Sequence, residues 1–148
     1  METFWNVVQN IGLLVLRLTV AAIVMVHGWR HWFGDQGIQP LVDQLAAVGM
    51  PQPRLLAWCA VFLEIVGGTG LALGFATRVL AALFVAQFAV SFAWIDWYGG
   101  FFVANRGYEY TMLLAAAALL LVCFGSGALG LDHLFPARRK NREVVTDA

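Results

Sequence analysis

Long apolar runs dominate the pattern of hydrophobic and polar positions along the chain. Four stretches approach the roughly 20 apolar residues that a helix needs to cross about 30 Å of hydrocarbon; they cover about 7–27, 55–75, 79–98 and 108–124. Their apolar residues are continuous rather than alternating, which favours helices over barrel strands, because a helix satisfies its own backbone hydrogen bonds in lipid. The pattern predicts an all-α integral membrane protein, a bundle of four transmembrane helices that forms one membrane domain over residues 1–148.

A shorter periodic pattern separates the first two stretches. Gly49 and Pro51 follow it and are expected to end a helix. Apolar residues recur at helical spacing among polar neighbours: Ile38, Leu41, Val42, Leu45 and Val48. The pattern predicts a short amphipathic helix on the outer surface of the membrane, between spans one and two.

Glycine and threonine mark a tight turn between the second and third stretches. Gly74 suits the end of one helix and Thr77 suits the cap of the next. These two spans are therefore expected to be antiparallel neighbours. Gly70 and Gly74 also form a G-x-x-x-G face, which favours close helix packing, either within the chain or across a homodimer.

Composition and charge strengthen the membrane interpretation. The chain is 61% hydrophobic and 12% charged, with a mean hydropathy of +0.75, which excludes an ordinary soluble domain. Its formal net charge of zero gives no indication of a nucleic-acid partner. A basic cluster opens the polar tail, 138–148, and places both termini in the cytoplasm: Arg138, Arg139, Lys140 and Arg142.

Two opposite charges lie inside the apolar stretches. Arg17 and Glu64 both fall near the middle of their spans at 1.5 Å of rise per residue, so they are predicted to be direct partners. Each charge alone would cost about 2.5 to 3.5 kcal/mol at the centre of a spanning helix. Two interpretations stay open: a structural clamp between helices one and two, or a proton or ligand site in which Glu64 changes charge.

A second group of polar residues collects at the outer ends of the spans. His27, Arg106 and Glu109 are expected to converge there and to hydrogen-bond a quinone head group or relay its protons. The alternative is that they make ordinary interfacial contacts. In the third stretch, Gln87 and Ser91 form a weak polar stripe that either lines a small cavity or bonds across helices. The predicted aromatic wall of the quinone site consists of Trp94, Trp97 and Tyr108.

Metal and disulfide chemistry find little support. His27 and His31 share an i, i+4 spacing, but two ligands are too few for a metal, so no metal site is predicted. Cys59 and Cys123 fall near opposite ends of their spans, whereas bridged Cα atoms are only about 4.4 to 6.8 Å apart. No haem, flavin or iron–sulfur motif is recognised, so any electron donor is expected to be a partner or a substrate.

The order of several short sequence landmarks resembles that of DoxX-like membrane proteins, from about Leu14 to Asp132. One position departs from the family pattern, because Arg30 and His31 stand where a lysine is common. The landmarks are Arg17, His27-Gly28, Gly49-Met50-Pro51, Glu64-x-x-Gly67-Gly68, Gly74-x-x-Thr77-Arg78, Gly107-Tyr108-Glu109 and Leu131-Asp132. The resemblance implies a four-helix bundle in a bacterial cytoplasmic membrane and a link to oxidoreductase systems, including quinone-reactive subunits.

Three functional hypotheses follow. The leading one is a membrane component of a redox system that binds a quinone or similar lipophilic molecule near the outer face, with a partner or a soluble substrate as electron donor. Arg17 and Glu64 would then organise its interior. The second is a non-enzymatic anchor or assembly scaffold for a partner complex. A small-solute transporter is the third, since charged midplane sites occur in transporters.

Overall fold

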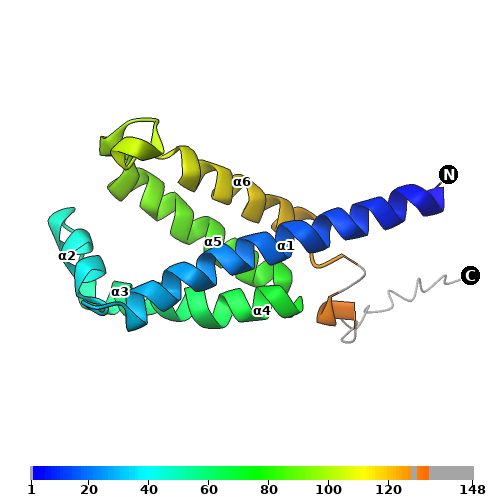
Figure 1. Ribbon diagram of the computed structural model, residues 1–148, viewed down its shortest axis with the longest axis horizontal. Coiled ribbons are helices and arrows are strands. Elements are labelled where there is room, and N and C mark those ends of the chain that lie inside the picture. The colour runs from blue at the N-terminus through cyan, green and yellow to red at the C-terminus, as the bar shows by residue number, and fades with distance from the viewer. Residues whose placement is uncertain (1, 128–129, 134–148) are drawn as a thin grey trace, which may run out of the picture.

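Three long helical segments and one shorter helix make up most of the computed structural model, which describes residues 2–127 and 130–133 (Figure 1). The predicted polar tail, 138–148, lies outside the described residues. The first segment is α1, Glu2–Phe33. The second consists of α3 (Pro53–Phe62), the π-helix η1 (Leu63–Gly67) and α4 (Gly68–Leu73). The third consists of α5 (Thr77–Val90), the π-helix η2 (Ser91–Asp96) and the 3₁₀-helix η3 (Trp97–Gly99).

Shorter elements complete the described chain. They are α2 (Gln39–Ala47), the 3₁₀-helices η4 (Val103–Asn105) and η5 (Leu131–His133), and the apolar helix α6 (Glu109–Phe124). Among the described residues, three helical stretches are long and apolar enough to cross a membrane: Thr3–Phe33, Pro53–Leu73 and Thr77–Gly99. The prediction of an all-α membrane protein is confirmed, with three candidate spans of full length in this part of the chain. The helix at the fourth predicted span, α6, has only 16 residues.

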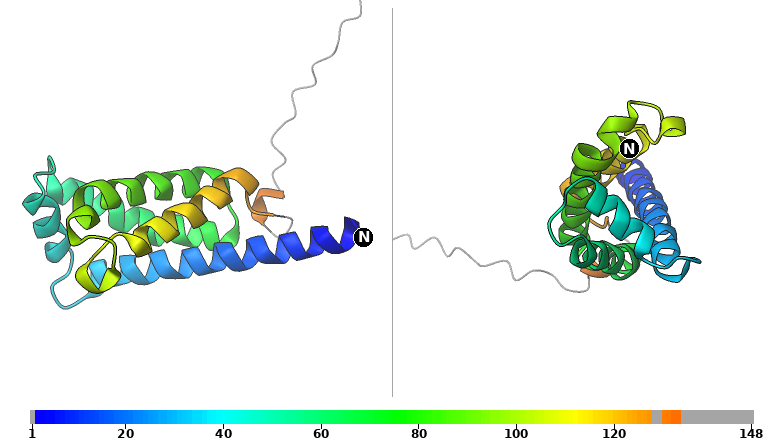
Figure 2. Two further views of the ribbon diagram at one scale, coloured as in Figure 1. Left: turned by 90° about the horizontal axis from the view of Figure 1, so that it is seen from above. Right: turned by 90° about the vertical axis from the view of Figure 1, so that its left-hand side faces the viewer.

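The long helices form two groups that separate toward one end of the molecule. Helix α1 packs on α4 and η1, and α5 packs along α6. Figure 1 shows the two groups close together where α4 turns into α5 and apart where α2 lies, and Figure 2 gives the same arrangement from two other directions. We call these the turn end and the α2 end.

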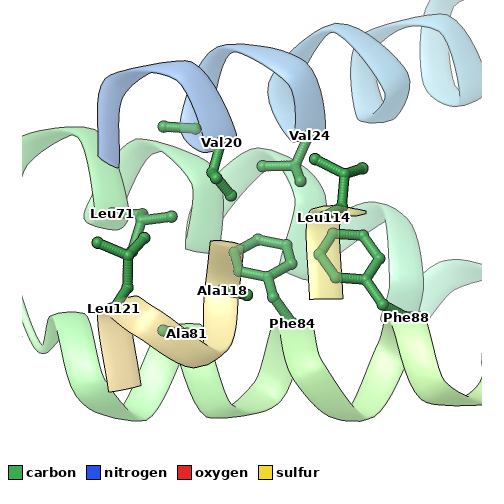
Figure 3. Packing of buried hydrophobic residues seen from close by; sticks show 10 residues of the cluster. Val20, Val24, Leu71, Ala81, Phe84, Phe88, Leu114, Ala118 and Leu121 are labelled. Atoms are coloured by element: carbon green, nitrogen blue, oxygen red, sulfur yellow. The ribbon is translucent and has the colours of Figure 1, made fainter. Parts of the chain in front are cut away.

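A compact apolar core joins the two groups toward the turn end (Figure 3). Glycines allow α4 to approach both α1 and α5 closely. A Cβ on Gly68 would stand 2.7 Å from Met25 Cγ of α1, and a Cβ on Gly70 would stand 2.7 Å from Leu80 Cδ1 of α5. The predicted close packing of the Gly70 face therefore takes place within the chain. The buried core residues are Val20, Ala21, Val24, Leu71, Ala81, Phe84, Phe88, Leu114, Ala118 and Leu121.

The α4–α5 turn is held by a residue far along the sequence. Gly74 ends α4 with a φ of 72°, as predicted. Thr77 does not cap α5, because it lies one residue inside the helix and Ala76 occupies the N-cap. The Asp132 carboxylate accepts instead from the backbone N–H groups of Ala76 (2.6 Å) and Thr77 (3.0 Å). The N–H of Asp132 donates to the carbonyl of Gly74 at 2.9 Å, which fixes η5 to the turn.

The predicted amphipathic helix is present as α2. Its apolar side buries Val42 and Leu45 against Ala57 of α3. Gly49 follows with a φ of 74°, a conformation that favours glycine and ends the segment as expected. Helix α2 is thereby fixed across the end of the molecule at which the two helix groups separate.

The Asp132 cap generates a stability prediction. Replacing Asp132 with alanine leaves two N–H groups at the start of α5 without their carboxylate, so the free energy of unfolding should fall by about 0.5 to 2 kcal/mol. Denaturant unfolding in lipid nanodiscs measures the change. Asp35→Ala is the matched control, because Asp35 is exposed and removing its charge should change stability little. Equal effects of the two substitutions would contradict the capping role.

Candidate functional site

Arg17 and Glu64 are not partners, contrary to the sequence-based prediction. The Arg17 Nη1 donates to the Ser126 carbonyl at 2.9 Å, and Arg17 lies against Gly74 at the turn end. Glu64 lies against Gly28, and positions 17 and 28 of one helix are about 16 Å apart along its axis. The two spans are not level, because α1 is 32 residues long and its residue 17 lies beside the end of α4, far from Glu64.

Glu64 instead joins three helical segments near the α2 end. Its Oε1 accepts from Gln87 Nε2 of α5 at 2.9 Å, and its Oε2 lies 3.0 Å from His31 Nδ1 of α1. An ionised carboxylate only accepts hydrogen bonds, so the His31 Nδ1 carries the proton. The Glu64 side chain is 9% exposed and that of His31 is 29% exposed. The two hydrogen bonds offset part of the cost of burying a carboxylate in an apolar bundle.

Two π-helical turns lie beside this cluster. Glu64 belongs to η1, and the residues of η2 continue the helix that carries Gln87. A π-helical turn inserts an extra residue into a helix and re-aims the side chains around it, and such turns are frequent at functional sites. Each of them contributes to one cavity, η1 through Leu63 and Glu64 and η2 through Ser91, Ile95 and Asp96.

The cavity has a volume of about 840 Å³ and lies where the two helix groups separate. Side chains of α1, α3, η1, α5, η2 and α6 surround it, and α2 contributes Leu41, Gln44 and Leu45. Apolar side chains predominate, and a few polar groups interrupt them, which is the usual composition of a small-molecule site of about 300 to 1,000 Å³. Glu64, His31 and Gln87 form its most deeply buried polar cluster.

Further polar groups lie around the cavity. The hydroxyl of Thr111 donates to Asp96 Oδ2 at 2.5 Å. The Nδ1 of His27 is 2.9 Å from the Ile23 carbonyl, so it must donate, and in the neutral ring Nε2 is then an acceptor. The same imidazole stacks on Tyr110 with ring centroids 6.4 Å apart. These residues give the cavity both donors and acceptors away from Glu64.

The DoxX family model matches residues 12–97, which is more than half of the chain. The chain belongs to the DoxX family. It is 32% identical over 126 residues to inner membrane protein YphA of Escherichia coli K12, covering 82% of this chain and 88% of that protein. It is 28% identical over 135 residues to putative oxidoreductase CatD of Bacillus subtilis 168, covering 91% and 95%.

A third similar protein is also described as an inner membrane protein. Inner membrane protein YqjF of Escherichia coli K12 is 27% identical over 128 residues, covering 85% of this chain and 93% of that protein. No solved structure matches the chain. The match to the DoxX model spans α1 through η2 and so includes the whole Glu64 cluster, whereas Arg106 and Glu109 lie beyond it.

Only some of the residues that the sequence nominated in this DoxX protein meet in the cavity. His27, Glu64 and Arg106 line it, as do Gln87 and Ser91 of the predicted polar stripe. Glu109 does not line it, because its Oε1 accepts from the Val103 N–H at 2.8 Å and closes the loop before α6. Glu109 and His27, which were expected to converge, therefore do not line the cavity together.

The nominated aromatic residues lie outside the cavity. Trp97 and Tyr108 stack with centroids 5.7 Å apart, and both contact Phe92. Trp94 is 49% exposed. None of the three nominated rings lines the cavity, so they do not form a wall of this cavity. Trp97 and Tyr108 instead pack with Phe92 beside the loop before α6.

Sequence reasoning missed the roles of His31 and Asp96. The i, i+4 spacing of His27 and His31 places both on the cavity side of α1. In the sequence, this spacing suggested only a pair of metal ligands. Asp96 closes an apolar stretch and resembles an ordinary boundary residue. The π-helical turn that directs it toward Thr111 has no recognisable sequence pattern.

The approach of α1 to Glu64 generates a prediction. A Cβ on Gly28 would stand 2.7 Å from Glu64 Cβ and 2.8 Å from Ile65 Cγ1, so Gly28→Ala should force α1 away from η1 and lower the free energy of unfolding by about 1 to 3 kcal/mol. Gly12→Ala on the same helix is the control, because its Cβ would have nothing within 4 Å. It should be neutral or stabilise by up to about 1 kcal/mol. Equal unfolding midpoints for the two variants would contradict the close packing.

Proposed function

We propose that this DoxX-family protein is a membrane component of a redox system and binds a quinone or a similar lipophilic molecule in the cavity beside Glu64. The observation that carries the proposal is a buried carboxylate held at the wall of an 840 Å³ cavity by His31 and Gln87. A purely structural carboxylate would be surrounded by packed side chains, whereas this one borders open space. Buried ionisable residues in membranes commonly mark ligand or proton sites.

The donor and acceptor set fits an uncharged polar head group. Among the residues that the structure describes, the buried Oε1 of Gln87 has no hydrogen-bond partner. A quinol hydroxyl is a donor that such an oxygen would accept, after a small rotation of the Gln87 amide. His31 and Glu64 would exchange the protons of the head group, because an imidazole and a carboxyl group can each release and accept a proton. A bound quinone would supply reversible two-electron chemistry.

A link to redox chemistry also has support from the comparisons. CatD, to which the chain is similar over most of its length, is described as a putative oxidoreductase. Because the sequence carries no recognised haem, flavin or iron–sulfur motif, the electron donor of the proposed system is a separate protein or substrate. A protein partner at the membrane is one of the two electron donors that the proposal allows.

We also propose that α6 crosses the membrane as a fourth span, with both termini in the cytoplasm. Helix α6 is apolar and packs along α5, although its 16 residues are fewer than a full span needs. The basic residues at 138–142 favour the cytoplasmic side. YphA and YqjF are described as inner membrane proteins, which supports the bacterial inner membrane as the location.

The proposed site predicts a bound quinone that depends on Glu64. Protein purified in lipid nanodiscs should retain near-stoichiometric quinone in its organic extract. Glu64→Gln removes a charged acceptor, and the affinity for quinone should fall by at least about tenfold, since hydrogen bonds to charged groups contribute about 1.5 to 3 kcal/mol. Chromatography of the extract with a quinone standard measures the occupancy.

Glu109→Gln is the matched control for this experiment. It removes the same charge near the α2 end but from a carboxylate bound to the Val103 N–H outside the cavity. Its quinone content should equal that of the wild type. Absence of quinone from the wild type, even after reconstitution with excess quinone, would overturn the proposal, and equal loss in both variants would place the ligand elsewhere.

A further inference from the structure

The cavity opens to the outside in two places of different chemistry. Eleven of its lining residues are exposed, and they fall into two groups. One group lies on α3 and α5 and consists of Leu56, Cys59, Leu83, Ala86 and Val90. The other consists of His27, Arg30, Gln44, Val103, Arg106 and Tyr110. We call the first the apolar opening and the second the polar opening.

The apolar opening faces lipid. Helix α3 belongs to the candidate span Pro53–Leu73 and α5 to the candidate span Thr77–Gly99. Its exposed side chains are therefore surrounded by hydrocarbon when these helices cross the membrane. Leu83 and Val90 are 48% and 41% exposed although they also line the cavity, so the wall between α3 and α5 is incomplete on this side.

The polar opening lies at the α2 end and suits contact with water or head groups. His27 and Arg30 come from the last turns of α1, Gln44 comes from α2, and Arg106 comes from the loop before α6. Charged and amide side chains at such a rim remain hydrated at a membrane boundary. The two openings therefore give the cavity a wet side and a lipid side.

We infer that the apolar opening between α3 and α5 is the entrance through which an amphiphilic ligand comes from the bilayer, leaving its chain in that opening and its uncharged head beside Glu64. This inference rests on the proposed ligand-binding function and adds the source and class of the ligand. The buried cluster lies within about one helical turn of the entrance, because Ala86 precedes Gln87 and Cys59 is five residues before Glu64.

The opening and the buried carboxylate both bear on which ligand fits. Ala86 and Cys59 are small side chains at the rim, so they leave room between the helices for an unbranched or isoprenoid chain. The Glu64 carboxylate disfavours an anionic head, which rules against phospholipids with negative head groups as the preferred ligand. A neutral ring with hydrogen-bonding oxygens and one long chain meets both conditions.

Blocking the entrance tests the inference. Ala86→Trp places a large ring at the rim, and Ala82→Trp is the control, because Ala82 is exposed on the same helix but does not line the cavity. The probes are a dimethoxy-methyl-benzoquinone that carries a decyl chain and the same ring without the chain. Binding of each probe is measured in nanodiscs for the wild type and both variants.

Ala86→Trp should weaken binding of the chain-bearing probe by about tenfold or more, the scale of steric overpacking, and leave the short probe within about twofold. Ala82→Trp should change neither. Cys59→Trp, from the opposite rim, should repeat the Ala86→Trp result, with Cys123→Trp on α6 as its exposed control outside the cavity. If Ala86→Trp and Cys59→Trp have the same effect, misfolding of a single variant does not explain the loss of binding.

Other outcomes overturn the inference. Unchanged binding of the chain-bearing probe in both rim variants, or equal loss of the two probes, would show that the chain does not pass between α3 and α5. Failure of the wild type to bind either probe would overturn the proposed function as well. That result is distinguishable because it is seen before any variant is compared.

Discussion

The buried carboxylate of Glu64 sets the requirements that the α2 end of the bundle has to meet. An ionised group in an apolar bundle needs hydrogen-bond donors close by, and donors from two other segments, His31 on α1 and Gln87 on α5, meet that need. Gly28 allows α1 to approach closely enough for His31 to reach the carboxylate. The Gln87–Glu64 hydrogen bond joins the two helix groups beside the cavity, whereas the His31 and Gly28 contacts hold α1 against η1 within one group.

Among the described residues, the two buried charged side chains are Arg17 and Glu64, and they stabilise different ends of the bundle. Arg17 lies at the turn end, where it donates to the Ser126 carbonyl and lies against Gly74, near the Asp132 cap of α5. These contacts join the chain after α6 to α1 and to the α4–α5 turn, where the core is closed. Glu64 lies at the open end, where the helices separate and α2 covers the gap. A stable closed end thus supports an end with room for a ligand.

The sequence predicted the helical architecture because hydrophobicity over long windows determines which segments can lie in lipid. The amphipathic helix at 39–47 and the Gly74 turn were also predictable, since spacing and backbone conformation are local properties. The partner of Glu64 was not. The pairing of two buried side chains depends on how far one helix is shifted along the other. Here α1 is shifted by a few turns, so His31, together with Gln87 of α5, contacts Glu64 in place of Arg17.

Other features depend on contacts that have no local sequence pattern. The cap of α5 comes from Asp132, more than fifty residues away, and displaced the expected role of Thr77. The π-helical turns that direct Glu64 and Asp96 toward the cavity also depend on tertiary packing. The candidate site was therefore predictable in part, through Glu64, His27, Arg106 and the Gln87 stripe, while its geometry required the fold.

The central claim is that Glu64 is bound by His31 and not by Arg17. Solid-state NMR measures it through the dipolar coupling between ¹³C in the Glu64 carboxyl and ¹⁵N in the candidate partners, in protein reconstituted in bilayers. The 3.0 Å separation of His31 Nδ1 and Glu64 Oε2 predicts a strong coupling to the imidazole that disappears in His31→Phe, and none to the Arg17 guanidinium. A Glu64 carboxyl carbon that couples to the Arg17 guanidinium, with a coupling unchanged in His31→Phe, would contradict the account.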